Sequence, residues 1–343
     1  MRRRFLTPFL SILSLSIFSL SMMVSTCLTA SAQGAPQKAA PKTTAPNTEP
    51  QKASVPNRGP RPDSTDPNVP EPEGGTITNG TYTNQYFGLS YPLPRDWKES
   101  LEGPPPSESG YYVLRNLEPG ETFKGPVKGS ALINASDLFF IQRPVSNSME
   151  FVKDMAGSMP RVYKVETAPT ETTLNGLSFA RFGYTAVDLH WVVLATEIRC
   201  HIVEFVFTSR DTQLLESLVK GVGNMKIPPE AGIATGTGGG QAPVCVKDYA
   251  TGENILHKVD PAQTGPKFTS VPVRLIIDAE GKVKHVHIIN AYPDQAKSIK
   301  EALLQWTFKP YKKDGKPVEI ETGIRFEFPP RSKSAASKPA GSL

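Results

Sequence analysis

The sequence predicts an α+β protein in which two small domains follow an export leader and a spacer. Aromatic and β-branched residues alternate with polar residues in two separate regions, as in strands that bury one face. Each region also carries apolar residues at helical spacing. Ten of the 33 prolines in this 343-residue chain lie in one early segment with almost no aliphatic residues. Such a segment cannot form a core, so it separates the leader from the folded part.

Residues 1–32 are predicted to be a secretory signal peptide. Three arginines precede an apolar stretch of residues 5–28, and Ala-Ser-Ala follows at positions 30–32, where signal peptidase would cleave. The alternatives are a retained membrane anchor, a lipidated Cys27 and a twin-arginine signal. The predicted location is the periplasm or the exterior, or, if the leader is retained, the inner membrane with the protein facing the periplasm.

The remaining boundaries follow from composition. Residues 33–75 are predicted to be a disordered proline-rich linker, residues 229–254 a glycine-rich linker and residues 329–343 a disordered basic tail. Folded domains are therefore expected at residues 76–228 and 255–328.

The composition also excludes several classes of protein. Multi-span membrane proteins, disulfide-dense mini-scaffolds and collagens do not fit it. The net charge is +5, but the leader carries three arginines and no other charged residue, so the rest of the chain has a net charge of only +2. We therefore expect no nucleic-acid partner, and a membrane contact only through an uncleaved leader.

The middle region predicts strands, a helix, more strands and a second helix. This order favours one antiparallel sheet with helices on a face. Ser146 or Ser148 is the expected cap of the first helix. The clearest expected elements are an opening strand or hairpin at 82–91, strands at 138–141, 177–184, 191–198 and 200–208 and a helix at 212–222.

The segment 82–97, YTNQYFGLSYPLPRDW, resembles the opening of PsbP-like domains. The resemblance implies an extracytoplasmic assembly or binding module without a catalytic constellation. None of that family's metal-binding positions can be carried over to this sequence.

We assign no catalytic residue, cofactor or metal ligand. Two histidines of the middle region, His190 and His201, have carboxylates near them in sequence, but a structural role is the better interpretation because His201 shares a strand face with apolar residues. No Gly-x-Ser-x-Gly elbow or Walker loop is present. His285 and His287 share a strand face, but two histidines with no cysteine or carboxylate partner are a weak metal signal. The carboxylates near His190 and His201 in the sequence are Asp188, Glu197 and Glu204.

The C-terminal region predicts a β-β-α-β order. Residues 271–278 alternate, so one face is expected to be buried, and Gly281 supplies a tight turn. The return strand is expected to place its two histidines on the face opposite Val286 and Ile288. A helical stripe and a last alternating strand, 318–328, follow.

This region is similar to the TonB C-terminal domain family. The matching segments are VRLIIDAEGKV at 273–283, WTFKP at 306–310 and DGKPV at 314–318. The residues that the motif assigns to structural roles are Gly281, Trp306, Phe308, Pro310 and Gly315.

The resemblance implies binding of an envelope or outer-membrane protein partner by β-strand addition at an exposed sheet edge. The candidate edge is the last strand, whose charged side chains are expected to face outward. Charges at an edge also discourage aggregation, and that alternative stays open. The candidate partner-binding residues are Val318, Glu319, Ile320, Glu321, Arg325 and Glu327.

After cleavage two cysteines remain, Cys200 and Cys245. An oxidising compartment would allow a disulfide between them that ties the two domains together.

The leading functional prediction is an exported, non-enzymatic protein that binds envelope partners. The alternatives are a membrane-anchored TonB-type energy transducer and an enzyme or ligand-binding protein that uses the middle domain. The transducer's membrane helix carries a histidine in that family, whereas all 5 histidines here lie at or beyond His190.

Overall fold

The computed structural model describes residues 60–121, 129–227, 243–262, 264 and 268–328. All of these residues fall within one compact unit. We call residues 60–75 the N-terminal segment, residues 76–227 the middle module and residues 243–328 the C-terminal module. Within the described ranges, no helix has the length and apolar character needed to cross a membrane.

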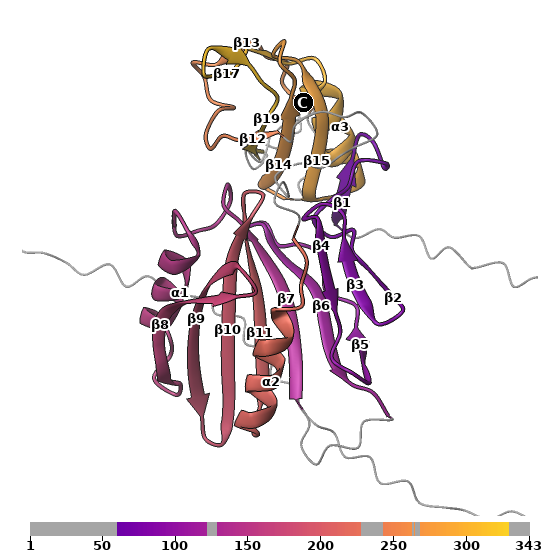
Figure 1. The fold of residues 1–343 in the computed structure, drawn as a ribbon. Helices are drawn as coiled ribbons and strands as arrows, with labels where there is room; N and C mark the ends of the chain where they lie inside the picture. Colours follow the sequence, from indigo (N-terminus) through magenta and orange to yellow (C-terminus); the bar gives the residue numbers. More distant parts are fainter. Residues whose placement is uncertain (1–59, 122–128, 228–242, 263, 265–267, 329–343) are drawn as a thin grey trace, which may run out of the picture. The chain divides into compact units, whose positions relative to one another are not determined.

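The middle module is built on a seven-stranded antiparallel sheet with the order β5-β6-β7-β11-β10-β9-β8 (Figure 1). A separate three-stranded sheet precedes it. The strands predicted at 177–208 are present, whereas the strand predicted at 138–141 is wrong, because these residues turn away after β7. The strands are β2 (Thr76–Thr78), β3 (Thr81–Asn84), β4 (Leu89–Pro92), β5 (Trp97–Leu101), β6 (Tyr111–Pro119), β7 (Gly129–Asp137), β8 (Lys164–Leu174), β9 (Leu177–Ala186), β10 (Leu189–Ile198) and β11 (His201–Ser209).

Two helices cover opposite faces of this sheet. Helix α1 (Ser148–Gly157) packs with Val193 and Ile202, and helix α2 (Thr212–Val222) packs with Leu194 and Phe205. The expectation of helices on one face was wrong, because β10 and β11 are apolar on both faces. The cap of α1 is Asn147, whose side chain accepts from the Glu150 amide, and not Ser146 or Ser148.

The C-terminal module contains a five-stranded sheet with the order β1-β15-β14-β19-β12. Helix α3 packs on one face of this sheet through a core that includes Ile299 and Trp306, which confirms the α+β class and the β-β-α-β order. The main elements are β14 (Ser270–Ile277), β15 (Val283–Ala291), α3 (Pro293–Leu303) and β19 (Ile320–Glu327). The minor strands are β13 (Ile255–His257), β16 (Thr307–Phe308), β17 (Lys312–Lys313) and β18 (Lys316–Pro317).

Both predicted linkers contribute an edge strand to this sheet, so the predicted boundaries at residues 75 and 254 are wrong. β1 (Arg61–Ser64) pairs antiparallel with β15, and β12 (Val244–Cys245) pairs parallel with β19. Sheet edges offer backbone donors and acceptors to any extended segment, so a polar, proline-containing sequence can pair there. Residues 1–59, 228–242 and 329–343, where the leader, most of both linkers and the tail are predicted, lie outside the described residues.

The C-terminal sheet is also buried on the face opposite α3. Every residue of β14 from Val271 to Ile277 is buried, which contradicts the expected burial of a single face. Arg274 is 2% exposed and Glu321 3% exposed, although Glu321 was expected to face outward. The cause is that the middle module and the N-terminal segment contact this second face.

Candidate functional site

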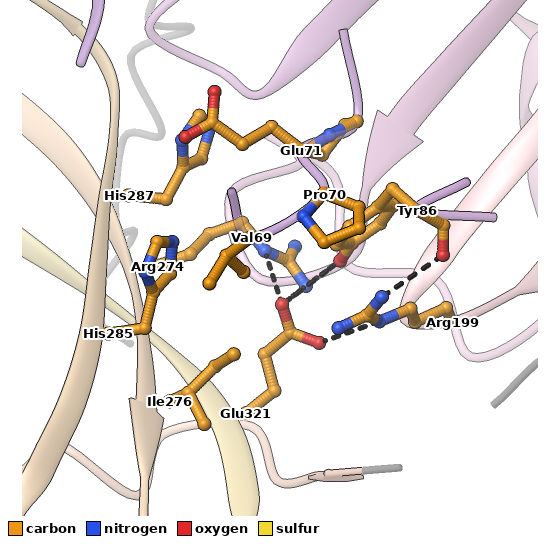
Figure 2. Close-up of a pocket in the computed structure, with 11 residues that line it drawn as sticks. Val69, Pro70, Glu71, Tyr86, Arg199, Arg274, Ile276, His285, His287 and Glu321 are labelled. Atoms are coloured by element: carbon orange, nitrogen blue, oxygen red, sulfur yellow. Dashed lines mark hydrogen bonds and ion pairs between the residues drawn. The ribbon is translucent and has the colours of Figure 1, made fainter. Parts of the chain in front are cut away.

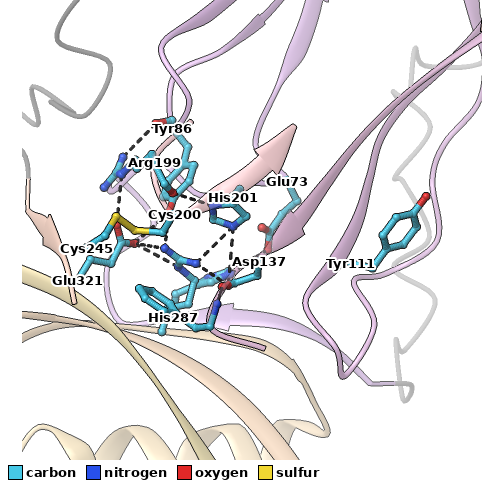
Figure 3. A network of polar contacts seen from close by, with 12 residues as sticks. Glu73, Tyr86, Tyr111, Asp137, Arg199, Cys200, His201, Cys245, His287 and Glu321 are labelled. Atoms are coloured by element: carbon cyan, nitrogen blue, oxygen red, sulfur yellow. Dashed lines mark hydrogen bonds and ion pairs between the residues drawn. A yellow bond between two sulfur atoms is a disulfide. The ribbon is translucent and has the colours of Figure 1, made fainter. Parts of the chain in front are cut away.

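A cluster of opposite charges lies where the C-terminal sheet contacts the middle module (Figure 3). We call Asp137, Arg199, Arg274 and Glu321 the arginine–carboxylate cluster. Arg274 on β14 donates to Asp137 at the end of β7, and its Nη2 lies 2.9 Å from Glu321 Oε1 on β19. The same nitrogen donates to the Tyr86 hydroxyl at 2.7 Å.

The tight turn between β10 and β11 supplies the second arginine. Arg199 and Cys200 are its two loop residues, and both have positive φ, 47° and 60°. Arg199 Nε lies 3.3 Å from Glu321 Oε2, and its Nη1 donates to the Tyr86 carbonyl oxygen at 3.0 Å. Cys200 forms a disulfide with Cys245 of β12. These contacts hold the turn in a conformation that is unfavourable for residues with a side chain.

The cluster pairs two positive charges with two negative ones. Burial would raise the pKa of Glu321, but Arg274 and Arg199 hold that pKa at about 2. Burial raises the pKa of Asp137 against the opposing effect of Arg274. Burial and the charge of Arg274 lower the pKa of His201, whose Nδ1 lies 2.8 Å from the Arg199 carbonyl oxygen. The arrangement is a fixed, charge-balanced contact between the two modules.

A second cluster lies beside it and is formed by Glu71, Glu73 and His287, which we call the histidine–glutamate cluster. Figure 2 shows Glu71 and His287, and Figure 3 shows Glu73 and His287. The two glutamates come from the N-terminal segment and the histidine from β15. His287 Nδ1 lies 3.2 Å from Glu71 Oε1, and His287 Nε2 lies 3.5 Å from Glu73 Oε1. The neighbouring His285 has its Nδ1 3.2 Å from the Thr65 hydroxyl oxygen. The structure therefore gives His287 the carboxylate neighbours that the sequence did not reveal.

The predicted edge residues divide into two groups. Strand β12 covers the first part of β19, because Val244 and Val246 donate to the carbonyl oxygens of Glu319 and Glu321. The Glu319 side chain pairs with Lys284 at 2.7 Å. Ile320 is buried, and the half-buried Val318 packs against the α3 side of the sheet. This part of the edge is therefore occupied by the chain itself.

The second part of β19 keeps an open edge. Beyond Glu321, no strand pairs with this side of β19 within the part of the chain that the structure describes. Arg325 and Glu327 are exposed there. Arg325 donates to the carbonyl oxygens of Glu108 and Phe140, and Glu327 accepts from the Ser270 hydroxyl.

The motif residues of the C-terminal module have structural positions. Gly281 has φ +85° in the β14–β15 turn, and Gly315 has φ +78° in the β17–β18 turn. Trp306 is 2% exposed and donates from Nε1 to the Val259 carbonyl oxygen at 2.7 Å. Phe308 is 1% exposed and packs beside Trp306, whereas Pro310 is exposed.

The structure does not bring together the titratable residues noted in the middle region. His190 pairs with Glu166 at 2.8 Å, and Asp188 pairs with Arg210 at 3.0 Å. His201 is fully buried among the aromatic rings of Tyr86, Phe87 and Tyr112. Buried Glu204 accepts from Ser136, and Glu197 is exposed.

Sequence reasoning missed Tyr86, Asp137, Arg199 and Arg274 as members of the site. One signal was present: Arg274 stands in an otherwise apolar run, with Val273 and Leu275 on either side. A charged side chain inside such an apolar run indicates a strand that is buried on both faces. Glu71 and Glu73 had no such signal, because they lie in a polar, proline-rich stretch.

LpqN and a cyanobacterial PsbP protein are two of the solved structures to which this chain is similar. LpqN, involved in cell envelope biogenesis of Mycobacterium tuberculosis, is 12% identical, with 50% of this chain and 92% of LpqN covered and a TM-score of 0.28. The PsbP protein of Synechocystis sp. PCC 6803 is 14% identical, with 46% and 99% covered and a TM-score of 0.30. Neither similarity, at these identities and scores, assigns an activity to this chain. No curated protein matches the chain.

The C-terminal module has a match among protein families. Its turn glycine, its buried tryptophan and its β-β-α-β order agree with the motif noted in the sequence. Residues 267–330 match the family model described as the Gram-negative bacterial TonB protein C-terminal, so the identification of this module as a TonB C-terminal domain is confirmed.

Proposed function

We propose that the protein is an exported, non-enzymatic protein of the cell envelope whose C-terminal module binds an extended segment of an envelope protein. The observation that carries this proposal is the open edge of β19 from Gly323 to Glu327, in a module that matches the TonB C-terminal family. The binding mode is β-strand addition, in which backbone hydrogen bonds supply the affinity and side-chain pockets the selectivity.

The backbone direction at this edge follows from the pairing. The Phe328 amide donates to the Thr269 carbonyl oxygen on the β14 side. Backbone groups of neighbouring residues alternate in direction along a strand, so those of Gly323, Arg325 and Glu327 point away from β14. At about 3.4 Å per residue this open stretch spans roughly 17 Å, which accommodates a short strand.

The other edge of the sheet supports the same choice. On that side β15 is already paired with β1 from Arg61 to Ser64. An incoming strand there would have to displace β1 or pair with its four residues. The open part of β19 requires no such displacement, so it is the preferred docking edge.

The test uses the whole protein with a photo-crosslinking amino acid at Arg325, exposed to an envelope fraction. We expect adducts with an envelope protein, identified by mass spectrometry. In the same protein, Glu327→Pro should lower the adduct yield by about fivefold, because it removes one outward backbone donor. That donor is not used in pairing with β14, so the variant should keep its fold.

The matched control is Glu327→Ala, which removes the same side chain but keeps the backbone donor. It should leave the adduct yield unchanged. A crosslinker at the fully exposed Val187 reports nonspecific capture. Equal adduct yields for the proline and alanine variants, or no more adduct at Arg325 than at Val187, would contradict strand addition at this edge.

A further inference from the structure

Three metal-ligating side chains converge on the second face of the C-terminal sheet. Glu71 and Glu73 come from the N-terminal segment, and His287 comes from β15, more than 200 positions further along the chain. One potential ligand atom from each residue lies within 4.8 Å of the others. No neighbouring sequence motif forces this arrangement, so it arises only from the docking of the N-terminal segment.

Five of the six polar side-chain atoms of this cluster are buried without a hydrogen-bond partner among the described residues. His287 is 3% exposed, and neither of its ring nitrogens makes a hydrogen bond among the described residues. Its contacts with Glu71 and Glu73 are within ion-pair distance but do not have hydrogen-bond geometry. Both carboxylate oxygens of Glu73 and Oε1 of Glu71 are likewise buried without a hydrogen bond. Buried polar groups left without a hydrogen bond are costly, and the concentration of such groups at one point indicates a site for a further ligand.

We propose that Glu71, Glu73 and His287 bind a divalent transition-metal ion, with Zn²⁺ as the ion that the donor set fits best. An imidazole nitrogen together with carboxylate oxygens is a ligand set that Zn²⁺ accepts, and water can complete the coordination. Ca²⁺ and Mg²⁺ prefer oxygen ligands throughout. Two carboxylates and a neutral histidine carry a charge of −2, which balances the ion and makes its burial favourable.

The surroundings allow this occupancy. A cavity of about 10 Å³ beside Glu71 and His287 has room for roughly one water molecule (Figure 2). Arg199 and Arg274 line the same cavity, but their charges are compensated by Asp137 and Glu321. Glu71 and Glu73 therefore supply the negative charge that a cation would meet at this point.

Occupancy would join the N-terminal segment to the C-terminal sheet. Glu71 and Glu73 lie a few residues after β1, which pairs with β15, the strand that carries His287. The ion would fasten the segment at a second point close to this pairing. This role does not depend on strand addition at β19, so either proposal can fail without the other.

The test is calorimetric titration of the whole protein with Zn²⁺ after treatment with a chelator and dialysis. We expect one Zn²⁺ per chain. Glu73→Gln and His287→Ala should each weaken binding by at least about tenfold, the lower range for loss of a group that supports a metal site. Glu73→Gln nearly preserves shape, so it remains informative if His287→Ala does not fold. Hydrogen exchange gives a second readout: Zn²⁺ should slow it in residues 61–75 and β15 but not in β9 and β10.

The matched control is the exposed pair His190 and Glu166, which also places a histidine nitrogen beside a carboxylate, at 2.8 Å. His190→Ala and Glu166→Gln should leave Zn²⁺ affinity unchanged. The proposal is overturned if the protein binds no Zn²⁺, if Glu73→Gln binds it as tightly as the unaltered protein, or if the control variants lose affinity equally.

Discussion

At the scale of single residues, two glycines of the C-terminal module show why the same backbone conformation can matter to different degrees. Gly281 and Gly315 both have positive φ, +85° and +78°. A Cβ at Gly281 would lie 2.0 Å from the Phe308 carbonyl oxygen, whereas a Cβ at Gly315 would meet nothing within 4 Å. The Gly281 carbonyl oxygen also accepts from the Phe308 amide at 2.7 Å. Gly281 therefore fixes a close approach of two backbone segments in addition to forming a turn.

Gly281→Ala should lower the free energy of unfolding by at least about 3 kcal/mol, because the strained φ, the backbone displacement and the weakened hydrogen bond add together. Gly315→Ala carries the conformational cost alone, about 1 kcal/mol. Urea unfolding of both variants measures the difference. Equal losses would show that the close approach to Phe308 has no energetic role.

At the scale of the element, strand β11 shows that one strand can carry two different buried faces. Phe205 and Phe207 face the core beneath α2, and Ile202 faces α1. Glu204, on the α1 face, is 2% exposed and accepts from the Ser136 hydroxyl at 3.2 Å. Burial raises the pKa of Glu204 to about 7, against the opposing effect of the Ser136 hydrogen bond.

This shift predicts a pH-dependent stability. Between the unfolded pKa of 4.5 and the folded pKa of about 7, the folded state holds a proton that the unfolded state releases. Stability therefore falls as the pH rises through this window. Above it the cost is constant at roughly 3 kcal/mol, from about 1.4 kcal/mol per pKa unit. Glu204→Gln removes the titration and keeps the acceptor, so it should be more stable than the unaltered protein at pH 8 and nearly equal to it at pH 4.5.

Urea unfolding at several pH values measures the difference between the two proteins. The matched control is Glu171→Gln, because exposed Glu171 also accepts from a serine hydroxyl, that of Ser178, at 2.6 Å. A gap for Glu171→Gln as large as that for Glu204→Gln would contradict the role assigned to burial. A gap for Glu204→Gln that does not change with pH would contradict the prediction.

The edge strands of the C-terminal sheet also belong to this scale. β1 contains Pro62 and three polar residues, and β12 has only two residues. Neither strand is long enough to show a clear alternation of apolar and polar side chains, and their pairing uses backbone groups at a sheet edge. The disulfide between Cys200 and Cys245 joins β12 to the β10–β11 turn. A short strand that is weak by itself is thereby held in place.

At the scale of the whole molecule, the arginine–carboxylate cluster joins the two modules. Arg274 is the central residue, because it contacts both Asp137 of the middle module and Glu321 of its own sheet. Removing one partner of a buried pair leaves an uncompensated charge, which costs more than the pair itself contributes. The contact therefore constrains how the modules fit together whatever its net stabilisation.

Arg274→Met should destabilise the protein by about 3–5 kcal/mol, because Asp137 and Glu321 would remain buried with less compensation. The control is Arg143→Met, which breaks an exposed pair with Asp154 and should cost less than about 1 kcal/mol. Equilibrium denaturation of both variants gives the comparison. A loss for Arg274→Met no larger than that of the control would mean that solvent reaches the cluster.

The fold was predictable where periodicity is strong. Helix α2 has the predicted bounds, Thr212–Val222, because its apolar stripe is regular. The open part of the β19 edge, with Arg325 and Glu327, falls inside the predicted strand. Tyr86, Asp137 and Arg274 could not be predicted to meet, since they come from three distant segments and their contact depends on how the modules dock.

The α+β class, the β-β-α-β order and the TonB-type motif could be predicted from the amino-acid sequence, because alternation, helical spacing and turn glycines are local properties. The folded structure was needed to show that the C-terminal sheet is buried on both faces, that Glu321 points inward and that Glu71 and Glu73 reach His287. These features depend on which surfaces pack together. A short-range pattern in the sequence does not predict a contact between residues more than 200 positions apart.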